Sequence, residues 1–434
     1  MKKTLSLLLI VVLVALAGGV ALLHFSDGQP PALTLEPGSG TVGRGTAFTL
    51  QAADPSGLRT VIVSLRSGSG AVVLASQEFD KTPAASIPFT LGEAKLPDGP
   101  IEIVVSAVDA SFRSLGKGNA GETVFPFVLD TKKPHLSVLS GQHNLNRGGA
   151  GCISYTANED LARTGVRVGP HFFPGYRLPG GDYACLFAFP YDMTPAEFAP
   201  RLEGEDLAGN LREQSFPFHV NDRSFRQDTL NIPDSFLEAK MPQYEADYPG
   251  LTSPLEIYLK VNTEMRVRDN AAILELGQRS APEPLWRGDF LRLPNAAPRA
   301  GFADARTYLY KGEVVDHQTH LGVDLASVQA APVPAANAGV VVRAGFNGIF
   351  GENVMIDHGL GLMTIYSHLS QIDVETGQTV DRGQIIGRTG TTGLAGGDHL
   401  HYGAYISGVA VNPIEWWDPN WIRNNVADRV GLGQ

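Results

Sequence analysis

The sequence predicts a mainly β protein with a long apolar segment at its N-terminus and a helical segment in its middle. Glycine (49 residues) and proline (29 residues) are plentiful, which is typical of chains rich in strands and tight turns. Alternating apolar residues such as Val61, Val63 and Leu65 are typical of half-buried strands. A chain of 434 residues is long enough for two to four domains. We therefore expect several β domains in series behind the apolar segment.

Residues 1–30 are predicted to form a signal anchor, a single transmembrane helix. Lys2 and Lys3 precede an apolar run from Leu5 to Leu23, which is close to the ~20 residues needed to cross a bilayer. The apolar core of a cleaved secretory signal is shorter, about 7–15 residues. The lysines would keep the N-terminus in the cytoplasm, so the rest of the chain would be exported. Secretion after cleavage near Ala15–Gly18 is the alternative.

An internal repeat follows the anchor. Each copy contains a strand-like run that leads into a leucine, and each copy ends in a Phe-Pro-Phe motif. The strand-like runs are Phe48–Asp54 and Cys152–Asn158. The Phe-Pro-Phe motifs lie in Val124–Phe127 and Ser215–Phe218. The period is about 90–105 residues, the size of an immunoglobulin-like β-sandwich. We predict two such domains, at 31–130 and 131–222.

The chain has two cysteines, Cys152 and Cys185. Both lie in strand-like runs of the second predicted sandwich. An even number of cysteines in an exported protein suggests a disulfide. Closing this loop would stabilise the domain by about 3–4 kcal/mol in the chain-entropy model. Two buried free thiols are the alternative.

The pattern changes between residues 223 and 298. Asp234–Lys240 and Pro254–Arg268 are predicted helices, because Asp234 and Pro254 are residue types that favour helix starts. Leu255, Tyr258 and Leu259 give the second helix a rough apolar stripe. The segment is therefore predicted to be a short helical linker between the sandwiches and the C-terminal domain.

Residues 299–434 are predicted to form an antiparallel β domain. Glycines separate short β-rich runs, which indicates strands joined by tight turns. The runs are Val340–Val342, Val354–Ile356, Thr364–Tyr366 and Gly383–Ile386. Gly390–Gly397 is expected to form a flexible loop at the rim of a groove.

The same domain concentrates residues that bind metals. Side chains repeat every two residues along a strand, so His320 and Asp324 can share a face, and so can His399 and His401. His368 is a fifth donor. Three protein ligands and a bound water are the usual form of a catalytic zinc site. Five donors would therefore leave two groups free for proton transfer beside the metal.

The motifs around these donors resemble those of peptidase family M23, the lysostaphin-like zinc endopeptidases that cut peptidoglycan. The resemblance covers roughly Phe302–Pro413. It includes Gly351–Gly359, Thr364–Ser370 and Val380–Gly393 as well as the HxxxD and HxH motifs. It implies that His320, Asp324 and His401 hold one Zn²⁺. It also implies that His368 and His399 are catalytic.

The resemblance implies a zinc endopeptidase that hydrolyses peptide cross-links of peptidoglycan through a metal-activated water. Histidine titrates near neutral pH, so both remaining imidazoles could carry protons, in roles the sequence does not separate. The alternatives are a non-catalytic peptidoglycan-binding scaffold, an amidase activator, or an endopeptidase for exported proteins. Related peptidases often carry a segment that covers the groove, so residues 223–298 could instead be a lid.

The expected setting is the inner membrane of a Gram-negative cell, with the bulk of the chain in the periplasm. Peptidoglycan is the expected partner, and the sequence identifies no protein partner. A net charge of −11 argues against a nucleic-acid partner. The two sandwiches are expected to act as a spacer, with docking to the wall or to a protein as the alternative. The sequence does not tell which peptide bond is cut.

Overall fold

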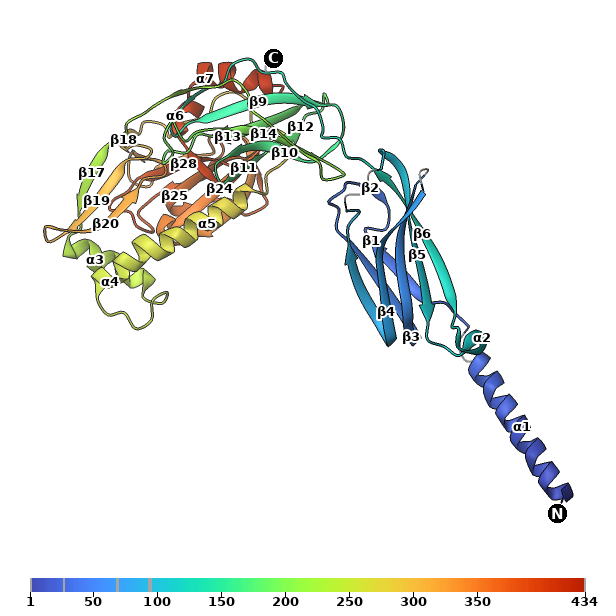
Figure 1. The fold of residues 1–434 in the computed structure, drawn as a ribbon. Helices are drawn as coiled ribbons and strands as arrows, with labels where there is room; N and C mark the ends of the chain where they lie inside the picture. Colours follow the sequence, from blue (N-terminus) through green and yellow to red (C-terminus); the bar gives the residue numbers. More distant parts are fainter. Residues whose placement is uncertain (1, 26–27, 68–69, 93–95, 433–434) are drawn as a thin grey trace. The chain divides into compact units, whose positions relative to one another are not determined.

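The computed structural model describes residues 2–25, 28–67, 70–92 and 96–432, and strands predominate in it (Figure 1). The mainly β prediction is confirmed. The chain divides into two compact units. The first comprises Met1–Pro134, Asp160–Ala162 and Glu205–Leu211, and the second comprises His135–Glu159, Arg163–Gly204 and Arg212–Gln434.

Helix α1 (Lys2–Phe25) occupies the segment predicted as the anchor. Its leucines and alanines favour a helix, and the exposed apolar side chains include Leu8, Leu13 and Leu16. Nevertheless, among the described residues no helix meets both the length and the apolarity required of a membrane span. The helix is thus confirmed, whereas a membrane anchor is not.

The first predicted sandwich consists of strands packed around an apolar core, and the short helix α2 (Arg113–Gly116) lies between its last two strands. The strands are β1 (Ala32–Glu36), β2 (Gly40–Val42), β3 (Phe48–Ser67), β4 (Gly70–Phe89), β5 (Gly99–Asp109) and β6 (Ala120–Leu129). Their order is β1-β3-β5-β6-β2, and β4 pairs with β3. Val61, Val63 and Leu65 are buried, as the alternation predicts. The immunoglobulin-like assignment stays a prediction.

The second predicted sandwich contains two four-stranded sheets and a two-stranded one, and most of it belongs to the second compact unit. One sheet has the order β11-β10-β14-β15, the other β12-β13-β9-β7, and β16 pairs in parallel with β8. The strands are β7 (Leu136–Val138), β8 (Asn144–Asn146), β9 (Ala150–Ala157), β10 (Leu161–Val168), β11 (His171–Pro174), β12 (Tyr176–Arg177), β13 (Tyr183–Ala188), β14 (Arg201–Asp206), β15 (Leu211–Gln214) and β16 (His219–Asn221).

The predicted disulfide is wrong, because Cys152 and Cys185 are both free and buried in the structure. They lie on the paired strands β9 and β13, where Cys152 is opposite Leu186 and Cys185 is opposite Ile153. Opposed residues of an antiparallel pair share a face, and adjacent residues face opposite sides. The two thiols therefore point to opposite faces of the sheet. Burial raises the pKa of Cys152 to about 12, so it stays a neutral core side chain.

Helices form where the sequence predicts them between residues 223 and 298. After β17 (Gln227–Asn231) come α3 (Asp234–Lys240), a 3₁₀ turn η1 (Met241–Tyr244), α4 (Pro254–Lys260), a π-helical stretch η2 (Val261–Met265) and α5 (Arg266–Gly277). Ser253 caps α4 by accepting a hydrogen bond from the N–H of Glu256. β17 pairs in parallel with β19, so the linker is hydrogen-bonded to the C-terminal domain.

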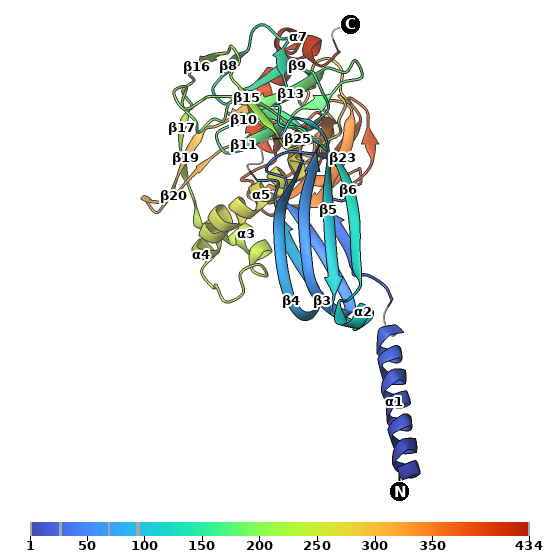
Figure 2. The ribbon, with the colours of Figure 1, turned by 45° about the vertical axis from the view of Figure 1, so that its right-hand side comes forward.

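The C-terminal domain is built on a sheet in the order β18-β21-β28-β25-β24-β23-β26, with every recorded pairing antiparallel. This confirms the predicted antiparallel domain. The elements are β18 (Ala297–Ala300), β19 (Ala305–Tyr310), β20 (Glu313–Thr319), β21 (Val323–Ala326), β22 (Pro332–Pro334), β23 (Gly339–Phe346), η3 (Gly348–Phe350), β24 (Glu352–Gly359), β25 (Leu362–Ile372), β26 (Thr379–Val380), β27 (Ile385–Thr389), β28 (Leu400–Ile406), β29 (Val409–Val411), α6 (Pro413–Trp416), α7 (Pro419–Asn425) and η4 (Ala427–Arg429). Figure 2 shows α3, α4 and α5 beside this domain.

A buried carboxyl group joins the second sandwich to the C-terminal domain. Glu415 on α6 accepts hydrogen bonds from the backbone N–H of Ala150 (2.9 Å) and from Nδ2 of Asn146 (3.1 Å). Burial raises the pKa of Glu415 to about 7, although both hydrogen bonds oppose that shift. Trp416 packs edge-on against Trp286 of the linker, and both indoles are fully buried. These contacts explain why the three segments form one compact unit.

Candidate metal centre

Two adjacent strands bring the predicted metal ligands together. Asp324 on β21 and His401 on β28 are directly opposite each other in the antiparallel pair, so their side chains share one face. His320 lies just before β21, where its backbone N–H donates to the carbonyl of Asp304. All three side chains are buried. Tertiary pairing thus converts two separate sequence motifs into one cluster.

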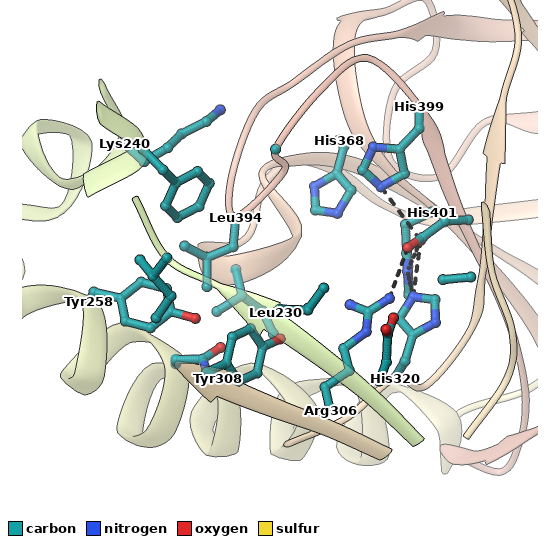
Figure 3. Close-up of a pocket in the computed structure, with 18 of the residues that line it drawn as sticks. Leu230, Lys240, Tyr258, Arg306, Tyr308, His320, His368, Leu394, His399 and His401 are labelled. Carbon is teal, nitrogen blue, oxygen red and sulfur yellow. Dashed lines mark hydrogen bonds and ion pairs between the residues drawn. The ribbon is translucent and has the colours of Figure 1, made fainter. Parts of the chain in front are cut away.

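The donor atoms of this triad converge closely (Figure 3). Nε2 of His320 lies 3.0 Å from Oδ1 of Asp324 and 2.9 Å from Nδ1 of His401. Nδ1 of His401 lies 3.1 Å from the same carboxylate oxygen. Nδ1–H of His320 donates to the carbonyl of Gly301 at 2.8 Å, which fixes the tautomer that presents Nε2.

The triad fits a tetrahedral divalent metal. Ligands at about 2.0–2.1 Å from zinc lie ~3.3 Å from one another in a tetrahedron, close to the separations observed here. Two imidazoles and one carboxylate without a thiolate are typical of catalytic sites rather than structural ones. Burial alone would raise the pKa of Asp324, but the neighbouring histidines lower it well below the ordinary value, so it is an ionised ligand.

His368 and His399 lie beside the triad. Their ring centroids are 4.9 Å apart, and that of His368 is 5.8 Å from that of His401. Nδ1–H of His368 donates to the carbonyl of Thr392, and Nδ1–H of His399 donates to the carbonyl of Gly397, both at 2.8 Å. His368 therefore has Nε2 available for a second partner, whereas Nε2 of His399 lies 3.5 Å from Oδ1 of Asp324.

The two imidazoles lie in different electrostatic environments. Burial lowers the pKa of His368 well below its usual value, and the neighbouring His399 and His401 add to that effect. The pKa of His399 is raised instead, because its interactions with Asp324 outweigh its burial. His368 also has a left-handed backbone with a φ of 63°. Such strain, of order 1 kcal/mol or more for a residue that is not glycine, is concentrated at functional sites.

The loop at Gly390–Gly397 lies at the rim, as the sequence predicts. Thr392 accepts from His368 through its carbonyl, donates its hydroxyl to the carbonyl of Leu369 at 2.8 Å, and accepts from the N–H of Glu352 at 2.9 Å. Leu394 and Gly396 line the cavity. The loop therefore both borders the cavity and orients a functional histidine.

A cavity of about 730 Å³ opens beside the five predicted residues. Its other wall comes from β17, β19 and the helices, as Figure 3 shows for Leu230, Lys240, Tyr258 and Tyr308. The helical segment holds the rim through the hydroxyl of Tyr244, which donates to the carbonyl of Gly348 at 3.2 Å. The linker is thus part of the site, and it borders the cavity without filling it.

Arg306 is a site residue that the sequence analysis missed. Its Nη2 donates to Oδ2 of Asp324 at 3.1 Å, on the side of the carboxylate away from the histidines. Its Nε is buried without a hydrogen-bond partner among the described residues. No motif marks it, because it lies on β19, before the HxxxD sequence, and meets Asp324 only through the fold.

Two histidines near the motifs lie outside the centre. His317 is on strand β20, not in the loop that its sequence context suggests, and its Nδ1 lies 3.2 Å from Oγ1 of Thr307. His358 is fully buried, with its ring nitrogens 2.7 Å from the carbonyl of Ala338 and 2.8 Å from Oγ1 of Thr364. His358 is therefore a core residue held by its own hydrogen bonds.

The model of Peptidase family M23 matches residues 318–413, which contain the four histidines and the aspartate of the site. The DD-carboxypeptidase/endopeptidase Mpg of Neisseria meningitidis is 44% identical over 95 residues, 22% of this chain and 22% of that protein. The peptidoglycan DD-endopeptidase ShyA of Vibrio cholerae is 44% identical over 96 residues, again 22% of each protein. The chain thus matches only about a fifth of the length of these curated relatives.

The solved structures that the chain resembles include the catalytic domain of lysostaphin from Staphylococcus simulans. It is 29% identical, with a TM-score of 0.25, and the match covers 29% of this chain and 94% of that one. The matched family residues, the antiparallel sheet and the His-Asp-His triad lie in the same part of the chain. The chain carries a peptidase M23 domain in its C-terminal part.

Proposed function

We propose that this protein is a zinc endopeptidase that hydrolyses peptide cross-links of peptidoglycan through a metal-activated water. The observation that carries the proposal is the intact constellation of five residues. His320, Asp324 and His401 converge as ligands. Two further imidazoles lie beside them: His368 has Nε2 available, and His399 directs Nε2 toward Asp324 at 3.5 Å.

The side chains of the centre have different chemical roles. When held by the triad, zinc supplies a Lewis acid that lowers the pKa of its water toward about 7. Nε2 of His368 and Nε2 of His399 can each accept a proton from the attacking water or return it to the leaving amine. The protonated form of either imidazole can also donate a hydrogen bond to the charge that develops on the scissile carbonyl oxygen.

Two observations favour a peptide substrate from the cell wall. The relative Mpg is named a DD-carboxypeptidase/endopeptidase, and the relative ShyA is named a peptidoglycan DD-endopeptidase. The cavity of about 730 Å³ extends from the metal centre along β17 and β19, which leaves room for a peptide on one side of the reacting bond. Which bond of the cross-link is cut stays open.

The proposed substrate implies export. Lys2 and Lys3 precede the apolar run from Leu5 to Leu23 and favour retention in the inner membrane with the catalytic domain in the periplasm, and cleavage with secretion is the alternative. Fractionation of cells that express the full chain tests this. The chain should be recovered with membranes and be sensitive to protease added to opened periplasm; recovery in the cytoplasm would oppose it.

Digestion of purified peptidoglycan tests the activity. The full chain loaded with zinc should release uncross-linked muropeptides, identified by mass, and chelation should stop their release. His320→Ala should abolish the products. His317→Ala is the matched control, because His317 is close in sequence but lies on β20 outside the centre.

The second candidate function is a non-catalytic scaffold or amidase activator. This candidate is supported by the second β-sandwich, which packs on the catalytic domain through Glu415 and offers further binding surface. A protein that binds zinc and peptidoglycan but releases no muropeptides would support this function and overturn the proposed hydrolysis. Cleavage of casein without cleavage of peptidoglycan would instead indicate an endopeptidase for proteins.

A further inference from the structure

The cavity beside the metal centre is lined by an excess of cationic side chains. These are Lys240, Arg266, Arg299 and Arg306. Among the described lining residues, the carboxylates are Asp228 and Asp324. The whole chain has the opposite balance, with a net charge of −11. The positive charge of the cavity is therefore a local feature that the overall composition does not explain.

Both lining carboxylates already have cationic partners. Asp324 accepts from Arg306 at 3.1 Å, and Asp228 accepts from Arg226 at 2.6 Å. Within the described part of the chain, Arg266 makes no ion pair with any carboxylate. Among the described residues, the charge on Arg266 is thus not neutralised by a direct ion pair, although the carboxylate of Asp316 is nearby.

Hydrogen bonds to neutral groups hold Arg266 in place. Its Nε donates to the carbonyl of Asn262 at 3.1 Å, and its Nη2 donates to Oδ1 of the same residue. The nearby carboxylate of Asp316 accepts from Asn262 at 2.6 Å and from Gln318 at 3.0 Å, so other donors occupy it. The guanidinium is oriented in advance of any ligand, which reduces the entropy lost on binding.

Arg266 and Arg306 come from α5 and β19 and line the same cavity. Burial is the main cause that lowers the pKa of Arg266. The charge of Arg306 also lowers it, whereas Tyr308, Tyr258 and Asp316 oppose the shift. Nε of Arg306 is buried and has no hydrogen-bond partner in the part of the chain that the structure describes. Like charges that are held close together and partly desolvated are costly unless an anion binds between them.

We propose that Arg266 and Arg306 form an anion subsite that binds a carboxylate of the peptide substrate next to the metal centre. The inference rests on the proposed function, because it assigns the substrate class of that same cavity. Guanidinium groups bind carboxylates through paired, charge-assisted hydrogen bonds. The apolar neighbours Leu230, Tyr258 and Tyr308 lower the local dielectric and strengthen that attraction. The subsite would favour stem peptides with a free carboxylate over amidated ones.

Calorimetric binding to the full chain tests the subsite without hydrolysis. The protein is loaded with zinc and carries His368→Ala, and the probes are a short peptide ending in two D-alanines as the free acid and as the amide. We expect the acid to bind roughly ten-fold more tightly or better, the range of a hydrogen bond to a charged group. Arg266→Gln should remove that preference and leave the affinity for the amide unchanged, whereas Arg266→Lys should retain part of it.

Two controls separate the arginines from other causes. Arg279→Gln, an exposed site paired with Glu275, should leave the preference intact. If the preference for the acid persists after chelation and still depends on Arg266, binding of the acid to zinc alone is excluded. Circular dichroism and thermal unfolding confirm that each variant is folded before binding is compared.

The outcomes for subsite and function are distinct. Three results would each overturn the subsite. The acid and the amide bind with equal affinity, Arg266→Gln weakens the binding of both equally, or the acid does not bind. If the unmodified protein still releases muropeptides in that case, the proposed function stands alone. A preference that depends on Arg266, in a protein that releases no muropeptides, would keep the subsite and overturn the hydrolysis.

Discussion

At the metal centre, backbone carbonyls decide which nitrogen each histidine presents. The carbonyls of Gly301, Thr392 and Gly397 each accept a hydrogen from Nδ1 of one imidazole. Nε2 of that imidazole then faces the site. His401 is different, because its Nδ1 faces the triad and its buried Nε2 has no partner among the described residues. The shape of the backbone thus selects the tautomers on which metal binding and proton transfer depend.

The ligands and the proton-transfer residues should respond differently to substitution. His320→Ala should lose both bound zinc and activity, because it removes one of three ligands. His368→Ala should keep its zinc and lose activity by about 10²–10⁴-fold, the usual contribution of general acid–base catalysis. Metal analysis and muropeptide release on the same preparations check this. Loss of zinc from His368→Ala would contradict the division of roles.

Arg306 should affect the zinc affinity of the centre through its ion pair with Asp324. Arg306→Gln removes the charge that faces Oδ2 of Asp324, so we expect zinc affinity to change by about 10–100-fold, as for other residues that support a ligand. Competition with a chelator measures that affinity independently of hydrolysis. Arg299→Gln is the control, because Arg299 lines the cavity without touching a ligand. Unchanged zinc affinity in Arg306→Gln would show that the ion pair does not support the metal.

At the scale of elements, the site is assembled where sheet, rim loop and helical linker meet. The sheet supplies Asp324 and His401, the loop orients His368, and the linker contributes the far wall of the cavity. Asp269 of α5 accepts a hydrogen bond from the N–H of Ile349 at 2.8 Å, which fixes η3 next to the cavity. The linker is therefore a structural partner of the rim.

A glycine substitution tests this contact between α5 and η3. Gly348 has a φ of 44°, and a Cβ there would lie 2.0 Å from Oδ2 of Asp269. Gly348→Ala should therefore lower stability by several kcal/mol, since backbone strain and a lost buried hydrogen bond add together. Gly377→Ala is the matched control, because its φ is 91° and its surroundings are open. That variant should cost only about 1 kcal/mol, and equal costs in denaturant unfolding would contradict the contact.

Removing the linker should weaken the domain rather than activate it. A fragment that begins at Pro298 lacks β17, which pairs with β19 from Gln227 to Asn231, and it lacks the buried Trp286 that packs on Trp416. Loss of a buried tryptophan alone costs about 3–5 kcal/mol. We expect lower thermal stability and lower zinc-dependent activity than in the full chain. Activity that rises on trimming would show instead that the segment is a lid.

At the scale of the whole molecule, the second predicted sandwich and the C-terminal domain share a buried acid. The carboxyl of Glu415 accepts hydrogen bonds from two groups of the sandwich, and its pKa is raised to about 7 by burial. Arg429 of the C-terminal segment also donates to the carbonyl of Cys152 at 2.6 Å. The docking of these segments therefore depends on the protonation of one side chain.

The stability of the second unit should fall as the pH rises from 5 to 8. Glu415 ionises near its ordinary value of 4.5 in the unfolded chain but only near 7 in the folded one. The native state thus binds more protons over that range, and stability is lost progressively up to about pH 7. The loss should be of the order of 3 kcal/mol. Glu415→Gln should remove most of it in urea unfolding, while the exposed Glu313→Gln should not; a slope unchanged in Glu415→Gln would contradict this role.

The sequence by itself determined the mainly β class, the helices at Asp234–Lys240 and Pro254–Arg268, the antiparallel C-terminal domain and the five residues of the centre. These depend on local periodicity, helix start signals and motif spacing, which act over a few residues and can be read in order. The structure brought the five together as expected, with His320, Asp324 and His401 as the converging triad.

The tertiary structure alone decided which distant residues meet. The register of β9 and β13 turns Cys152 and Cys185 to opposite faces and excludes their disulfide, although spacing allowed it. Arg306 reaches Asp324, and Arg266 reaches the same cavity, because β19 and α5 pack beside the metal centre. Strand register and packing are set by the burial of whole surfaces, a long-range property that no local pattern in the chain contains.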